Sequence, residues 1–174
     1  MTPTGGGRRK DVHDRALGLL AVRARSRREL QQRLTSAGYG TAEIEETLER
    51  LAGVGLVDDE AFALAFAEHA VGTRGSGRRA VESALFKKGV PRETIELVLA
   101  EVSGDAGDEF ERALDVARAR VSRLRGQDRA TAFRKLFSFL ARRGYGASVA
   151  REAAMRALDV DEAAETDQVD GVRG

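Results

Sequence analysis

Apolar residues spaced four apart, with a glycine four residues further on, occur at three places in the chain. The glycines are Gly38, Gly89 and Gly144, and an apolar residue follows each of them. Such a run predicts an amphipathic helix that ends in a left-handed glycine cap, where a Cβ atom would clash. Because the three copies lie 51 and 55 residues apart, they predict an internal repeat of somewhat more than fifty residues.

A second apolar stripe follows each glycine after six, ten and thirteen residues, a spacing that predicts another amphipathic helix. The stripes are Ile44, Leu48 and Leu51 in the first copy, Ile95, Leu99 and Val102 in the second, and Ala150, Ala154 and Ala157 in the third. Since the last copy has alanines where the others have larger side chains, we expect the third unit to have a thinner and looser core.

A leading helix is predicted before each capped helix. Its apolar residues are Leu17, Leu20, Ala21 and Ala24 in the first copy, Phe62, Ala65 and Phe66 in the second, and Phe110, Ala113, Leu114, Ala117, Val121 and Leu124 in the third. The sequence therefore predicts an all-α fold of three tandem three-helix repeats. Because each small unit buries too little surface alone, we expect the units to stack in an elongated, curved array.

Local signals place the boundaries of the units. Ser26 and Glu29 form a capping box, Pro91 suits a first helical position, and Asp58 begins an acidic helix start. We assign residues 12–57, 58–104 and 105–158 to the three repeats. Residues 1–11 and the acidic segment 159–174 lack apolar periodicity and are predicted to be disordered. The glycine-containing segments 102–108 and 72–77 are predicted hinges.

Charge follows the repeat, although the net charge is only +1. Residues 15–34 contain six basic residues and one acidic, residues 71–92 again six and one, and residues 118–143 nine and one. The intervening segments are acidic. Stacked units would gather the basic helices along one side, which favours a phosphate backbone or an acidic protein groove as partner. Helix-dipole complementarity and surface ion pairs are the competing explanation.

Little in the sequence supports catalysis or cofactor binding. The chain has no cysteine and only two histidines, of which His69 extends an apolar stripe and is expected at a core edge; no metal site is predicted. The Gly75–Gly77 segment lacks the preceding strand of a phosphate-binding loop. We therefore expect a protein that is not an enzyme and has no cofactor. Without an apolar run of membrane length or a secretory signal, we expect a cytoplasmic monomer that does not contact membranes.

Two segments carry a family resemblance. Residues 16–34, ALGLLAVRARSRRELQQRL, followed by AGY at 37–39, are similar to the first repeat of the RecX family. Residues 55–66, GLVDDEAFALAF, resemble that family's junction into its second repeat. The register of nine helices extends the resemblance over residues 12–158, with the third copy matching less well.

The resemblance implies a regulator of the recombinase RecA, active in recombination, DNA repair and the SOS response. Members of the family bind within the groove of the RecA–DNA nucleoprotein filament. They mostly inhibit RecA ATP hydrolysis, strand exchange and coprotease activity. No short family motif marks the contact residues, so none is carried over from the family.

The basic clusters provide the candidate contacts with RecA or, weakly, with DNA. They are Arg23, Arg25, Arg27, Arg28, Arg74, Arg78, Arg79, Arg123, Arg125, Arg142 and Arg143. Two other hypotheses remain open. A stand-alone DNA-binding or transcription-type module would bind duplex DNA tightly and with salt sensitivity, although no recognition helix is evident. A helical adaptor for another protein would not depend on Arg74, Arg78 and Arg79 for nucleic-acid or RecA binding.

Overall fold

The chain folds into helices throughout the part that the computed structural model describes, residues 11–104 and 106–170. Nine α-helices and no strand occur in these residues. The helices are α1 (Val12–Val22), α2 (Arg27–Ser36), α3 (Thr41–Gly53), α4 (Asp59–Glu68), α5 (Arg78–Lys87), α6 (Arg92–Ser103), α7 (Ala106–Val121), α8 (Arg129–Arg142) and α9 (Ala147–Asp170). A π-helical turn, η1 (His69–Thr73), extends α4, and a 3₁₀ turn, η2 (Ser122–Leu124), follows α7. The predicted all-α class is confirmed.

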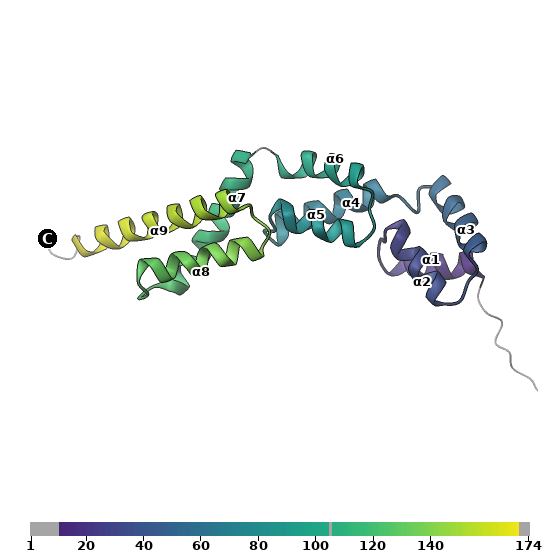
Figure 1. Cartoon of the computed structure of the whole chain (residues 1–174), viewed down its shortest axis with the longest axis horizontal. Helices are drawn as coiled ribbons and strands as arrows, with labels where there is room; N and C mark the ends of the chain where they lie inside the picture. The colour runs from purple at the N-terminus through teal and green to yellow at the C-terminus, as the bar shows by residue number, and fades with distance from the viewer. Residues whose placement is uncertain (1–10, 105, 171–174) are drawn as a thin grey trace, which may run out of the picture.

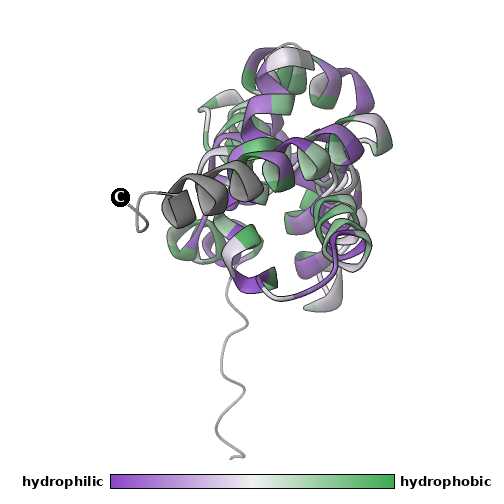
Figure 2. Cartoon of the chain, turned by 90° about the vertical axis from the view of Figure 1, so that its left-hand side faces the viewer, coloured by the Kyte–Doolittle hydropathy of each residue, from purple (hydrophilic) through white to green (hydrophobic). Residues whose placement is uncertain are grey.

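Consecutive helices form three units with separate apolar cores, α1–α3, α4–α6 and α7–α9. Figure 1 shows that the units follow one another along the long axis of an elongated molecule. In the end-on view of Figure 2, hydrophobic and hydrophilic residues alternate along each helix. This alternation reflects thin units in which every helix keeps one face towards solvent. The predicted tandem array of three-helix repeats is confirmed.

The three repeat glycines end the middle helices as predicted. Gly38, Gly89 and Gly144 have φ angles of 85°, 78° and 91°, the left-handed region that favours glycine. The amide of Tyr145 donates to the carbonyl of Leu140 at 3.2 Å, and Tyr39 makes the same bond to Leu34. Both tyrosine side chains are buried. Each tyrosine therefore closes the turn after its helix, which is the role that its position predicts.

The helices begin where the capping residues in the sequence predict, except that the start of α6 is shifted by one residue. The Ser26 hydroxyl oxygen accepts from the Glu29 amide at 3.1 Å, and Asp58 accepts from the first-turn amides of α4. Pro91 is the N-cap of α6 rather than its first helical residue. Asp128 caps α8 by accepting from the Thr131 amide at 3.0 Å.

The buried face of the leading helix in the first unit only partly matches the predicted one, since Leu17 and Leu20 do pack against the core. Val12 and Ala16 are buried, whereas Leu17 and Leu20 are half-buried and Ala21 is exposed. Ala24 lies beyond the end of α1 and is also exposed. The error arises because alanine fits a buried or an exposed position equally well, so a stripe of alanine and leucine does not define one face.

In the second unit Phe62 is buried as predicted, but Ala65 is exposed. His69, expected at the edge of the core, is also exposed. It begins the π-helical turn η1, whose wider i→i+5 geometry changes the register of the helix. Ala70 and Val71 consequently occupy the buried positions.

The third unit differs from its prediction in two ways. Its core is the largest of the three among the described residues, because the buried alanines of α9, such as Ala150 and Ala154, pack beside α7 and α8. Helix α9 also continues to Asp170, where disorder was predicted from residue 159. Residues 159–170 contain no glycine or proline that would end the helix, although four of the twelve are aspartates, which favour helix less than alanine or glutamate. The predicted disorder of residues 1–10 and 171–174 lies outside the described residues.

The first joint, between units one and two, places the start of α2 against the end of α5. The Ser26 hydroxyl donates to the carbonyl of Lys88 at 2.5 Å. The amide of Arg27 donates to the Asp59 carboxylate at 2.8 Å, and the Lys88 ammonium lies 3.5 Å from the Glu29 carboxylate. Polar side chains from both units therefore hold this joint together.

The second joint, between units two and three, repeats the arrangement with main-chain groups. The amides of Gly77 and Arg79 donate to the carbonyls of Arg143 and Gly144, at 2.8 and 3.2 Å. The Arg78 amide donates to the Glu109 carboxylate at 3.2 Å, as Arg27 does to Asp59. The start of α5 thus lies against the end of α8. The segment 72–77, a predicted hinge, is part of this contact; the other predicted hinge, 102–108, includes residue 105, which lies outside the described residues.

Candidate basic binding surface

Two hollows beside α8 share a wall and are lined by basic side chains. One hollow, of about 440 Å³, lies between α7, η2 and α8; the other, of about 410 Å³, lies over the second joint. Arg120 and Phe139 line both, so the two hollows adjoin. We call their basic lining residues the basic surface: Arg74, Arg120, Arg123, Arg134, Lys135, Arg142 and Arg143.

Among the described residues no ion pair neutralises the charges of the basic surface, although Asp128 lies close enough to Arg134 for their charges to interact. No carboxylate lines either hollow, and within the described residues none of the seven basic side chains forms an ion pair. Arg134 donates to the Thr131 hydroxyl at 2.9 Å and Lys135 to the Gln127 side-chain oxygen at 2.7 Å, and both partners are neutral. A concentration of unpaired cations attracts anionic ligands.

The ring of Phe139 holds two of these cations. The guanidinium carbons of Arg120 and Arg143 lie 4.7 and 4.9 Å from the ring centroid, within the range of cation–π attraction. Arg143 also donates to the carbonyl of Gly75 at 3.4 Å and to that of Arg74. These contacts fix the positions of two like charges close to each other, an arrangement that a bound anion would stabilise.

Helix α8 supplies three of the seven cations of the basic surface, Arg134, Lys135 and Arg142. Ala132, Leu136 and Leu140 bury its opposite face in the core. Thr131, Arg134, Lys135, Ser138 and Arg142 line the α7–α8 hollow at helical spacing.

Four of the eleven candidate residues line the basic surface: Arg74, Arg123, Arg142 and Arg143. Arg125 is exposed but lines neither hollow. The sequence reasoning missed Arg120, Arg134 and Lys135. Arg134, Lys135 and Arg142 follow each other at helical spacing, and this signal was available in the sequence.

The candidates of the first unit make contacts within that unit or across the first joint. Arg23 forms an ion pair with Glu29 at 2.8 Å, and the hydrogen bond from Arg23 to Glu29 raises the pKa of Arg23. The main-chain amide of Arg27 donates a hydrogen bond to the Asp59 carboxylate. The Arg28 side chain occupies the space that a Cβ atom on Gly89 would need, so it packs against the first joint.

Arg25 is a buried residue and not a surface contact, so its assignment as a candidate is wrong. It is 7% exposed, and its Nε donates to the carbonyl of Leu19 at 3.1 Å. Its buried Nη1 has no hydrogen-bond partner. Burial, followed by the positive charge of Arg23, lowers the pKa of its guanidinium.

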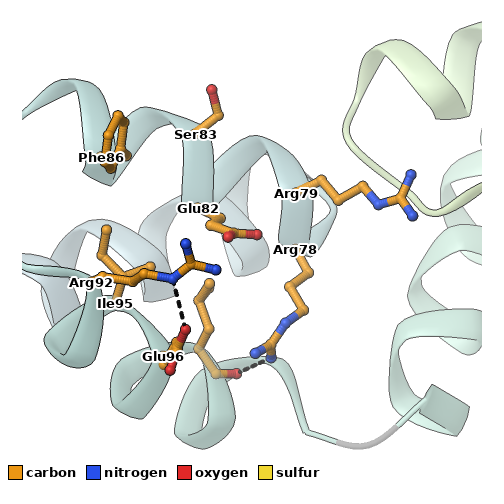
Figure 3. Close-up of a pocket in the computed structure, with 9 residues that line it drawn as sticks. Arg78, Arg79, Glu82, Ser83, Phe86, Arg92, Ile95 and Glu96 are labelled. Atoms are coloured by element: carbon orange, nitrogen blue, oxygen red, sulfur yellow. Dashed lines mark hydrogen bonds and ion pairs between the residues drawn. The ribbon is translucent and has the colours of Figure 1, made fainter.

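Arg78 and Arg79 line a different hollow, of about 640 Å³, between α5 and α6. Figure 3 shows Glu82 between Arg78 and Arg92, while Arg79 points away towards the third unit. Arg92 pairs with Glu96 at 3.1 Å, and Arg78 donates to the carbonyl of Leu99 at 3.0 Å. This hollow contains two carboxylates, Glu82 and Glu96, beside its three arginines, which distinguishes it from the basic surface.

Two further classes of site find no support in the described part of the chain. Among the described residues, no group of three or more His, Cys, Asp or Glu side chains is placed to hold a metal ion. None of the described helices combines the length and the apolar content that a membrane crossing requires.

Three stacked three-helix units with a carboxylate-free basic surface define the chain as an elongated helical repeat protein with an anion-attracting face. The family models for the first, second and third three-helix domains of RecX match residues 13–51, 58–99 and 107–154, in that order. The chain belongs to the RecX family.

Similar proteins include the regulatory protein RecX of Mycobacterium avium, 40% identical over 82% of each chain. The regulatory protein RecX of Mycobacterium tuberculosis is 37% identical over 90% of this chain and 91% of that protein. The crystal structure of RecX from Lactobacillus salivarius superposes with a TM-score of 0.74 at 20% identity, over 86% of this chain and 95% of that one. This structural match supports the fold.

Proposed function

We propose that the chain regulates the recombinase RecA by binding the RecA–DNA filament in the cytoplasm as a monomer. In this proposal it lowers RecA ATP hydrolysis, strand exchange and coprotease activity during recombination, DNA repair and the SOS response. The observation that carries the proposal is the match of all three RecX domain models, in order, along one chain. The chain acts as a binding protein, without catalysis of its own.

The shape and charge of the molecule support this proposal. An elongated array of three units (Figure 1) is suited to contact successive subunits of a filament. The basic surface provides a face for the anionic parts of a nucleoprotein.

The test is a titration of the full chain into RecA bound to single-stranded DNA, with ATP hydrolysis and filament length as readouts. We expect hydrolysis to fall with increasing protein. The double variant Arg123→Gln/Arg142→Gln should inhibit less. The matched control Arg151→Gln/Arg156→Gln, which removes two exposed charges from α9, should inhibit as the unmodified chain does. Unchanged hydrolysis and filament length at saturating protein would refute the proposal.

A stand-alone DNA-binding module is the second candidate, favoured by the absence of carboxylates from the basic surface. It predicts tight binding to duplex DNA with a sequence preference and with strong salt dependence. It also predicts no effect on RecA beyond competition for DNA. Inhibition that persists when DNA is in large excess over the added chain would exclude it.

A further inference from the structure

We infer that the basic surface binds the phosphate groups of a nucleic-acid strand, and that it is assembled only while the second joint is closed. This inference rests on the proposed function, since it names the ligand of the same surface. The side chains of the surface favour a phosphate backbone over an acidic protein, and the contacts across the second joint make the surface depend on that joint.

The surface lacks the features of a protein-docking site. Stable protein interfaces centre on exposed apolar or aromatic anchors. The exposed large apolar side chains of the described residues are Val22, Val54, Leu56, Phe86, Leu97, Met155 and Val160. None of them lines either hollow. The one aromatic ring that lines the hollows, Phe139, is already engaged by Arg120 and Arg143.

The side chains that are present match phosphate chemistry. Six of the seven cations are arginines, whose planar guanidinium groups donate two parallel hydrogen bonds to phosphate oxygens. The two adjoining hollows extend from η1 across α7 to α8. Such an extended row of cations, with no carboxylate among the residues that line the hollows, suits a ligand with regularly repeated charges, which is a nucleic-acid backbone.

The basic surface draws on two units. Arg74 comes from the second unit, immediately after η1, and the other six cations come from the third. Arg143 is held in place by the carbonyls of Arg74 and Gly75. The Tyr145 hydroxyl donates to the carbonyl of Gly75 at 3.1 Å. Opening the joint would separate Arg74 from the remainder and release Arg143 from its partners.

Phosphate binding and joint closure are therefore linked. A ligand that contacts Arg74 and the cations of the third unit together binds the closed joint better than the open one, and so stabilises it. A substitution that opens the joint must weaken binding even when it leaves every charge in place. The dependence of binding on the joint distinguishes a site that the joint assembles from a surface that is basic whether or not the joint is closed.

The first experiment measures binding of a short fluorescent oligothymidylate to the full chain by anisotropy, without RecA, over a range of salt concentrations. Arg123→Gln/Arg142→Gln should weaken binding about tenfold at moderate salt and reduce the salt slope by about 0.7 for each phosphate that is no longer neutralised. The control Arg151→Gln/Arg156→Gln should retain the affinity. Equal affinities for the two double variants would overturn the assignment of the site.

The second experiment opens the joint without changing charge. Gly77 has a φ of −75°, which any residue adopts, but an added Cβ would overlap the main chain of Gly144 and Tyr145. Gly77→Ala should weaken oligothymidylate binding several-fold. Gly53→Ala, in α3 of the first unit, where a Cβ also meets open space, should not. Tyr145→Phe, which removes only the hydroxyl hydrogen bond to Gly75, should give a smaller loss of binding. This variant tests the joint independently if Gly77→Ala does not fold. Unchanged binding by both Gly77→Ala and Tyr145→Phe would overturn the dependence on the joint.

The outcome for RecA separates this inference from the proposed function. If the unmodified chain inhibits RecA but does not bind oligothymidylate, the surface binds acidic protein groups, and the inference is wrong while the proposed function stands. If the chain binds oligothymidylate with the expected variant effects but never affects RecA, the inference stands and the proposed function is wrong.

Discussion

The hydroxyl of Ser26 donates a 2.5 Å hydrogen bond to the main-chain carbonyl of Lys88, a residue 62 positions later in the next unit. At the second joint the equivalent pair is Gly77 and Arg143, joined through the Gly77 amide at 2.8 Å. In both joints the acceptor is the residue before a repeat glycine, at the end of a middle helix. The start of each middle helix thus lies against the end of the middle helix in the following unit.

Ser26→Ala should destabilise the chain through the loss of two interactions. The hydroxyl caps α2 and also bonds Lys88. Loss of a cap costs about 1 kcal/mol, and loss of a hydrogen bond to a half-buried carbonyl costs about another 1 kcal/mol. Urea unfolding should show the sum of both. Ser83→Ala, at an exposed position of α5, is the control and should change the unfolding free energy little; an equal loss in both variants would contradict the role of Ser26.

The first joint should weaken in acid. Burial raises the pKa of Glu29, but the hydrogen bond from Arg23 and the positive charges of Lys88 and Arg23 outweigh it, so the net pKa lies below its ordinary 4.5. A lowered folded pKa means that the ionised carboxylate stabilises the fold above pH 4.5, and that this contribution is lost as the pH falls through the folded pKa. Unfolding followed between pH 7 and pH 3, about the range over which carboxylates titrate, should show the loss. Glu29→Gln should be less stable at neutral pH and should show a shallower fall; a parallel fall would argue against Glu29.

Gly144→Ala should destabilise the chain more than Gly126→Ala. Both glycines have a left-handed backbone, with φ angles of 91° and 80°, so each substitution costs about 1–2 kcal/mol for that conformation. A Cβ at Gly144 would in addition overlap Ala80 across the second joint, whereas one at Gly126 meets open space. Thermal unfolding should therefore show a clearly larger loss for Gly144→Ala. Equal losses would mean that the joint adds nothing to stability.

Arg25→Met should leave the stability nearly unchanged or raise it. The substitution removes a buried guanidinium with an unbonded Nη1 and keeps a long side chain in its place. Replacing a buried charge by a packed apolar group is often neutral or stabilising. Oligothymidylate binding and RecA inhibition should also remain unchanged, since Arg25 does not reach the basic surface. A loss of binding in a normally folded Arg25→Met variant would restore Arg25 as a contact residue.

The repeat itself could be predicted from the sequence because its signals are local. Gly38, Gly89 and Gly144 end helices for a steric reason that acts within one turn. Side chains such as Leu34 and Leu85 are large enough to define the buried face. The buried face of the leading helix in the first unit was only partly predicted because alanines such as those at positions 21 and 24 carry too little apolar surface to decide which face is buried.

Whether an individual arginine is paired, buried or exposed depends on contacts between residues far apart in the sequence. These contacts could not be predicted from the sequence. Arg23 is paired, Arg25 is buried and Arg28 lies on Gly89, although all three look like exposed charges in a basic segment. The basic surface likewise depends on the second joint, which brings Arg74 and Arg143 together across 69 positions. The count of charges indicated the same segment of the third unit but did not identify the residues that line the hollows.

Helix α8 differs from α2 and α5 at the end that would receive a further unit. It has 14 residues instead of 10, and its first turn is capped by its own Asp128. In the earlier units a carboxylate of the following unit bonds the start of the middle helix, Asp59 for α2 and Glu109 for α5. Asp128 bonds the third amide of α8, as Ser26 bonds the third amide of α2, whereas Asp59 and Glu109 bond the first amide of the helix that they contact. The first and second units thus each depend on a carboxylate from the unit that follows, so removal of a following unit would leave the first amide of the preceding middle helix without its carboxylate partner.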